Sequence, residues 1–241
     1  LRFDGQGTAS AEGLREGDLG MVSELFAQAS GSAAYHVQLG FRAGVPELTV
    51  SSLLQGMAVN LPAPLGKTAD TSMPVRYEQR VLSVLDGAQG PQAATDRLQL
   101  AVGPASAPVL SVQYERDITG DTARVLRGGI AVGLGRDEAV AVPPTGVQAN
   151  LRLNELDVDA WSALLPSTAG DATGQAGVAQ DTMDYLPTVA ALRAGRVVQG
   201  GRTFHDVVIG GDRVGDLWRA NVSAREFDGY VEYRQPAGRF A

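Results

Sequence analysis

The clearest pattern in this chain is an alternation of apolar and polar residues that begins at Gly146. The apolar positions are Val147, Ala149, Leu151 and Leu153, and the polar positions are Gln148, Asn150, Arg152 and Asn154. A period of two is typical of a β-strand with one apolar face and one polar face. We therefore expect an amphipathic strand here, and the function of the chain depends on what covers its apolar face.

After this strand the period becomes helical. Three apolar residues follow at helical spacing, namely Trp161, Leu164 and Leu165, before Pro166 ends the run. Asp157 and Asp159 precede them, and either carboxylate can accept hydrogen bonds from the free N–H groups of a helix N-terminus. The sequence thus predicts a short helix over Asp159–Leu165, with helix capping as the role of the aspartates.

A second alternation places four apolar residues on one side of a strand, namely Tyr35, Val37, Leu39 and Phe41. Ala43-Gly44 predicts a turn after it, and Glu47–Leu54 is the expected hairpin partner. The same kind of pattern predicts further strands at Leu1–Gly13, Val75–Leu85, Leu98–Val102, Leu110–Tyr114, Arg124–Val132, Ala139–Val142, Arg196–Gln199, Thr203–Ile209, Leu217–Ala224 and Gly229–Arg234.

The remaining segments predict one more helix and several loops. Asp18–Ala29 has helical spacing, and Gly31 is placed to end that helix. Leu61–Lys67 contains two prolines, which lack the N–H that a central strand donates, so it predicts a loop. Asp86–Asp96 is polar and also predicts a loop. Tight turns are predicted at two glycine pairs, Gly200-Gly201 and Gly210-Gly211.

Together these patterns predict a mostly β protein with an extended, curved antiparallel sheet and two short helices. A parallel sheet covered by helices is disfavoured, because the best strands alternate instead of being apolar on both faces. The apolar face needs a cover. A second sheet would make a sandwich, whereas a bound apolar ligand would make an open half-pipe or groove, and the alternation fits both.

Composition excludes several classes of protein. A net charge of −7 argues against nucleic-acid binding, because no basic stripe is present to replace phosphate counterions. The chain has no cysteine, so disulfides and thiolate sites are excluded. It starts without methionine, in mid-pattern, and we expect residues 1–241 to be one fragment of a longer protein. Residues 167–180 predict a flexible loop, with a division into 1–166 and 181–241 as the alternative organisation.

Candidate catalytic chemistry is sparse. His36 and His205 both fall in predicted strands, and no carboxylate lies at a spacing that predicts a metal site or a general base. The chain contains no nucleophile elbow and no phosphate-binding loop. We therefore expect no enzymatic activity, no catalytic residues, no bound metal and no cofactor.

Three stretches resemble the central region of the YhdP-like branch of the AsmA-like family, which are large envelope proteins of Gram-negative bacteria. They are Ser30–Tyr35, where a Gly precedes an aromatic strand, Leu53–Glu78, with its LPAPLGK core at 61–67, and Leu156–Leu165. The closing strands between Trp218 and Tyr233 also resemble that family's strand repeat. The similarity covers most of residues 20–235, and its most specific part is 53–78.

The resemblance implies a function. Family members are anchored in the inner membrane by an N-terminal helix, which we expect to lie outside this fragment, and they extend through the periplasm. Their strands form a long open half-pipe that holds phospholipid acyl chains and carries phospholipids between the inner and outer membranes. The candidate lining residues are Tyr35, Val37, Leu39, Phe41, Val147, Leu151, Leu153, Trp218 and Val222. The alternative is a scaffold β-domain of the envelope, with a closed core and no ligand.

Overall fold

The computed structural model describes residues 2–16, 28–87, 90–120, 122–136, 138–164 and 184–234. Within these ranges strands dominate, and the helices are α1 (Ala11–Glu16) and α3 (Val158–Leu164). The strands are β1 (Arg2–Ser10), β2 (Ala29–Arg42), β3 (Val45–Ser52), β4 (Met57–Val59), β5 (Val75–Gly87), β6 (Gly90–Val102), β7 (Leu110–Asp117), β8 (Arg124–Val132), β9 (Gly146–Asp157), β10 (Val189–Gln199), β11 (Arg202–Val214), β12 (Leu217–Ser223) and β13 (Asp228–Arg234).

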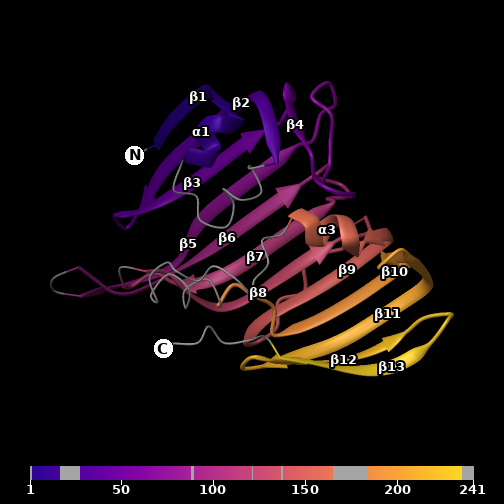
Figure 1. Ribbon diagram of the computed structural model, residues 1–241. Coiled ribbons are helices and arrows are strands. Elements are labelled where there is room, and N and C mark those ends of the chain that lie inside the picture. The colour runs from indigo at the N-terminus through magenta and orange to yellow at the C-terminus, as the bar shows by residue number, and fades with distance from the viewer. Residues whose placement is uncertain are drawn as a thin grey trace, which may run out of the picture.

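These strands form one open 13-stranded sheet. Its order follows the sequence from β1 to β13, with β4 attached beside β2 (Figure 1). Neighbouring strands are antiparallel except at β9, which runs parallel to both β8 and β10. The prediction of a mostly β, antiparallel-dominated sheet with two short helices is confirmed. The parallel strand pairs were not predicted, because alternation does not report the direction of the neighbouring strand.

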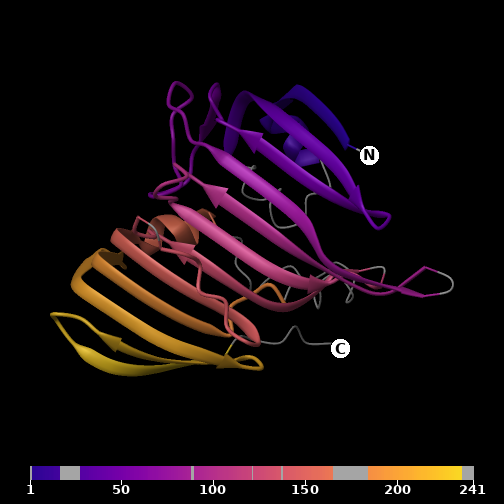
Figure 2. The ribbon, with the colours of Figure 1, turned by 180° about the vertical axis from the view of Figure 1, so that it is seen from behind.

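Both helices lie on the same face of the sheet. Ala11 of α1 packs with Ala33 of β2 and Met57 of β4 in one small core. Val158, at the start of α3, packs against a second core on β10 and β11 that includes Ala194 and Val207. Figure 1 shows the helix-bearing face, and Figure 2 shows the opposite face from behind. The two buried cores therefore cover only parts of this face.

The junction between β9 and α3 forms as its sequence predicts. The backbone N–H of Ala160 donates to Oδ1 of Asp157 at 2.8 Å, so Asp157 is the N-cap of α3. Asp159 has another role, because its carboxylate accepts the N–H groups of Gly200 and Gly201 in the turn between β10 and β11. Both glycines have positive φ, which confirms the predicted turn at this pair.

The predicted loop at Asp86–Asp96 is wrong. β5 extends to Gly87 and β6 begins at Gly90, so most of this segment belongs to a long hairpin. Its polar composition is misleading because Asp96 is fully buried in a charge pair with Arg116. The hairpin also contains register shifts, which interrupt the simple alternation between Leu85 and Asp86.

Two other local predictions are also wrong. Residues 139–142 form no strand but belong to the connection from β8 to β9, and this connection passes over Gly129, where an added Cβ would lie 2.3 Å from the carbonyl oxygen of Ala141. Gly210 and Gly211 lie within β11 and make no turn. Gly211 instead allows close approach of β12, since its Cβ would lie 2.4 Å from the carbonyl oxygen of Arg219.

The predicted helix at Asp18–Ala29 falls mostly on residues 17–27, which lie outside the described residues. Its expected C-terminal end differs from the structure, because Ala29 and Gly31 both belong to β2. Gly31 has a φ of 89°, and its Cβ would lie 2.3 Å from the carbonyl oxygen of Gly56. This glycine therefore serves a close backbone contact within the sheet. The predicted flexible loop 167–180 also lies outside the described residues.

Candidate functional site

Strand register brings the nine predicted lining residues onto one face of the sheet. Residues paired across neighbouring strands point to the same side, and a single row that is apolar except at Ser52 can be followed from β2 to β12 in this way. The row contains Tyr35, Ser52, Val75, Val102, Leu110, Val132, Leu151, Leu192, Ile209 and Val222. The other predicted lining residues lie in adjacent rows of this face, because they are an even number of positions from a row member on a regular stretch of strand. We call this side of the sheet the apolar face.

The nine predicted residues differ in their exposure. Val147 is 1% exposed, whereas Phe41 is 43% exposed near the β2–β3 turn. The other seven are half-buried. Partial burial along a single sheet indicates side chains that touch their row neighbours but have no complete cover. The apolar face is therefore accessible over much of its area, and Val147 is the exception.

The opposite face is polar and carries ion pairs between neighbouring strands. Glu115 of β7 accepts hydrogen bonds from Arg97 of β6 at 3.0 Å and from Arg127 of β8 at 2.7 Å. Burial opposes ionisation of Glu115, but the hydrogen bonds from the two arginines outweigh it and lower the pKa of this carboxyl below its usual value. We call Arg97, Glu115 and Arg127 the charge ladder. The two faces thus have opposite character, as the alternation predicts.

Sequence reasoning missed a polar cluster within the apolar face. Arg116 donates from Nε to Oδ1 of Asp96 at 2.9 Å and from Nη2 to Oδ2 at 2.6 Å. Gln79 donates to the same Asp96 at 2.9 Å. Asp96 is 0% exposed and shares the phase of Leu98, so the alternation itself carried the signal. A charge in phase with apolar neighbours indicates a buried partner.

Tyr185, which lies outside the sheet, completes this cluster. Its hydroxyl oxygen accepts a hydrogen bond from Nη1 of Arg116 at 3.2 Å. Tyr114 donates its hydroxyl to the carbonyl oxygen of Tyr185 at 2.9 Å, and the two rings meet edge to face with centroids 5.0 Å apart. The ring of Tyr114 lies over β8, where a Cβ on Gly128 would come within 2.3 Å of it.

Burial shapes the electrostatics of the cluster. It raises the pKa of Tyr114 to about 12, so this phenol stays protonated and remains a hydrogen-bond donor. Burial opposes the charge on Arg116, but its hydrogen bonds to Asp96 and Tyr185 outweigh that effect and raise the pKa of the guanidinium. Arg116 therefore keeps its charge where it forms a salt bridge with Asp96 within the apolar face.

The candidate histidines lie in separate parts of the sheet. His36 is exposed on the polar side of β2. His205 of β11 pairs with Glu226, with 2.6 Å between Nδ1 and Oε1, and its backbone N–H donates to the same carboxylate at 2.9 Å. Among the described residues, no three His, Asp or Glu side chains gather as a metal site. No helix in the described ranges is long and apolar enough to cross a membrane.

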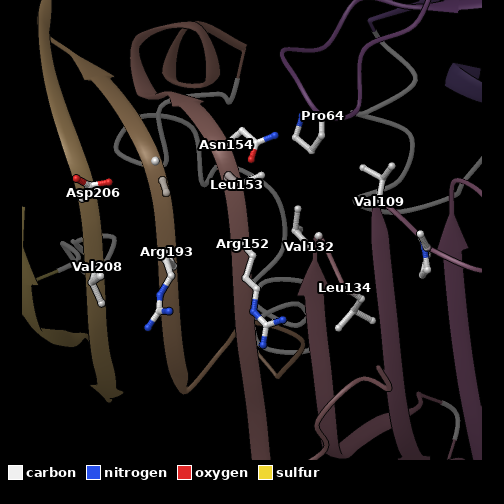
Figure 3. A pocket seen from close by; sticks show the side chains of 15 residues that line it. Pro64, Val109, Val132, Leu134, Arg152, Leu153, Asn154, Arg193, Asp206 and Val208 are labelled. Carbon is white, nitrogen blue, oxygen red and sulfur yellow. The ribbon is translucent and has the colours of Figure 1, made fainter. Parts of the chain in front are cut away.

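A hollow of about 780 Å³ lies beside β8 to β11 (Figure 3). Arg152, Arg193 and Val208 line it from three neighbouring strands, and they pair with one another in register on the polar face. Figure 3 shows Pro64 and Leu134 at its border. Leu153 is the single predicted lining residue that borders it, so this hollow and the predicted apolar site are different places.

Comparison with known proteins identifies the family. A family model described as YhdP protein matches residues 1–239, which is nearly the whole chain. No curated protein and no solved structure matches the chain. The match confirms the resemblance that rested on Leu53–Glu78 and the other stretches. The chain therefore belongs to the YhdP family, an AsmA-like family of lipid-transport proteins in the Gram-negative envelope.

Proposed function

We propose that this chain is a non-enzymatic segment of a periplasmic lipid conduit. In this proposal the apolar face forms one side of an open groove, and phospholipid acyl chains occupy it on their way between the inner and outer membranes. The lining residues are Tyr35, Val37, Leu39, Phe41, Leu151, Leu153, Trp218 and Val222, together with Val147 where it becomes accessible.

The observation that carries the proposal is the continuity of the apolar row across the sheet without a second sheet over it in the described ranges. Half-buried side chains such as Leu39 and Leu151 offer apolar area to a ligand. Each CH₂ group that leaves water contributes about 0.8 kcal/mol, so covering a dozen methylenes is worth roughly 10 kcal/mol before ordering costs. An acyl chain is long and flexible enough to follow such a row.

The alternative function is an envelope scaffold with a closed core and no ligand. A closed core requires a cover for the whole apolar face. In the described residues the covers include α1 together with β4, α3, and residues 184–188, and each meets only part of the face. This partial cover favours the conduit over the scaffold.

The test introduces a photo-crosslinking amino acid at Leu151 in the whole protein within the envelope, with Asn150 as the matched control. The two residues are adjacent on β9 and face opposite sides of the sheet. We expect crosslinked phospholipid, identified by mass spectrometry, from position 151 and not from position 150. Equal labelling at both positions, or no lipid at either, would contradict the conduit.

A charge at the same site tests how open the face is. Leu151→Asp in a closed core buries an unpaired carboxylate, which costs several kcal/mol and approaches the stability of a domain. On an open face the carboxylate stays hydrated, so we expect cooperative thermal unfolding close to that of Asn150→Asp, together with loss of lipid. Unfolding of Leu151→Asp without any lipid in the parent protein would favour the scaffold.

A further inference from the structure

Residues 184–188 lie across the apolar face between β7 and β11. At one end Tyr185 contacts Tyr114 and Arg116 of β7. At the other end Thr188 joins the sheet, because its N–H donates to the carbonyl oxygen of Val147 at 2.8 Å and its own carbonyl accepts the N–H of Arg213 at 2.8 Å. Two strand spacings of about 4.8 Å separate β7 from β9, and three residues can span that distance. We call residues 184–188 the strap.

The two ends of the strap are held differently. Thr188 is fixed by backbone hydrogen bonds to β9 and β11, and its hydroxyl also contacts the backbone of Val147. In the described part of the chain, residues 184–187 make no backbone-to-backbone hydrogen bond. Tyr185 is instead held by side chains, through one ring contact and the hydrogen bonds to Arg116 and Tyr114. The Tyr185 end can therefore detach without breaking the sheet.

The buried charge pair explains why this attachment is specific. The carboxylate of Asp96 accepts hydrogen bonds from Nε and Nη2 of Arg116. Nη1 of Arg116 therefore remains to donate to the hydroxyl oxygen of Tyr185. The bidentate pair fixes the plane of the guanidinium, and so fixes where the tyrosine must lie. The side chain of Arg116 is only 10% exposed, so little of it is available to a ligand while Tyr185 is attached.

The Tyr185 end of the strap covers part of the apolar face, which is the predicted lipid path. Tyr114, Gly128 and Val147 are register neighbours in one row of the apolar face. Tyr114 and Val147 are buried, whereas Leu39, which lies at the same level on β2, is half-buried. The apolar face is thus closed where the strap crosses β7 to β9 and more open toward β2.

Resting on the proposed function, we propose that the strap is a releasable wall that controls lipid access to the apolar face over β7 to β9, with Arg116 as the positioning residue that holds it closed. Detachment of Tyr185 would expose Tyr114, which shares a row of the apolar face with Val147, to an acyl chain. Reattachment would close the path at that point.

The central experiment compares the parent protein with Tyr185→Ala. This change removes the ring contact and the hydrogen bond from Arg116, and from their typical strengths we expect roughly a 30-fold larger open population. Uptake of self-quenched fluorescent phosphatidylethanolamine from phosphatidylethanolamine–phosphatidylglycerol vesicles should become faster. Tyr230→Ala is the matched control, because Tyr230 is an exposed tyrosine on the polar face.

Two conservative variants separate positioning from packing. Tyr185→Phe keeps the ring and loses the hydroxyl, so its uptake rate should lie between those of the parent and Tyr185→Ala. Arg116→Lys keeps a cation for Asp96 but cannot reach both partners with a planar fork, so it should also speed uptake. A merely structural role would lower thermal stability in these variants without changing the uptake rate.

A locked strap provides the opposite perturbation. The chain has no cysteine, so the double variant Tyr114→Cys with Tyr185→Cys has a unique pair of thiols for a short bifunctional maleimide. Crosslinking should slow lipid uptake relative to the same double variant without the reagent. Unchanged uptake in Tyr185→Ala and in the locked form would overturn the strap proposal and leave the conduit intact. If the parent and every variant take up no lipid, the conduit and the strap proposal both fail.

Discussion

Replacing Asp96 with asparagine should destabilise the protein far more than its small change in shape suggests. Asp96 is 0% exposed and accepts two hydrogen bonds from Arg116 and one from Gln79. The amide removes the negative charge and places an N–H₂ group among donors, so Arg116 keeps a buried charge without its counter-ion. Breaking a buried ion pair on one side typically costs about 3–5 kcal/mol. Because whole domains are stable by only about 5–15 kcal/mol, the effect should be large.

Denaturant unfolding followed by tryptophan fluorescence measures this loss. Asp117→Asn is the matched control, since Asp117 is on the same strand as Arg116 and forms a partly exposed ion pair with Arg124, with 3.6 Å between charged atoms. Such a pair contributes only about 0–1 kcal/mol. The double change Asp96→Leu with Arg116→Met should recover much of the loss, because no uncompensated charge remains. A loss below about 1 kcal/mol for Asp96→Asn, or no recovery in the double variant, would refute the reasoning.

Two further outcomes follow from particular contacts. Gly128→Ala should destabilise the fold by about 1–3 kcal/mol, because its Cβ would displace the Tyr114 ring from β8, and thermal unfolding measures this. The backbone and side-chain hydrogen bonds of His205 lower the pKa of Glu226. The ionised carboxylate of Glu226 should therefore stabilise the folded state above its unfolded pKa of about 4.3. This stabilisation should be lost as pH falls through the lower pKa of the folded state, and an NMR pH titration of the parent and Glu226→Gln measures it.

Much of the fold was predictable because the strands are amphipathic and locally connected. The alternation through Leu151 and Leu153 predicts both the strand and the shared face, and the helical spacing after Asp157 and Asp159 predicts α3. Prediction from the local pattern fails where a contact with a residue distant in the sequence determines the environment of a residue. Asp96 was assigned to a loop because its partner Arg116 is 20 positions away, and Gly211 was assigned to a turn although it accommodates β12.

The sequence predicts which face of the sheet carries the candidate site, but it does not predict which residues cover that face. Periodicity places Val147 in phase with Leu151, and register confirms that they share a side of the sheet. Val147 is buried and its backbone bonds to Thr188, and the apolar–polar pattern carries no information about that contact. Tyr185 had no periodic neighbours to mark it, so its contact with Tyr114 was not foreseeable from sequence alone.

The charge ladder also determines which strand alignments the sheet can tolerate. A slip of one residue would turn apolar side chains to the polar face, but a slip of two residues keeps the alternation intact. After a two-residue slip of β7, Glu115 would stand opposite Thr95 or Gln99 of β6 and opposite Val125 or Gly129 of β8. It would lose both arginines while remaining largely buried. An unpaired carboxylate there costs several kcal/mol. The charge ladder therefore favours the native alignment over two-residue slips, which the hydrophobic pattern alone does not distinguish.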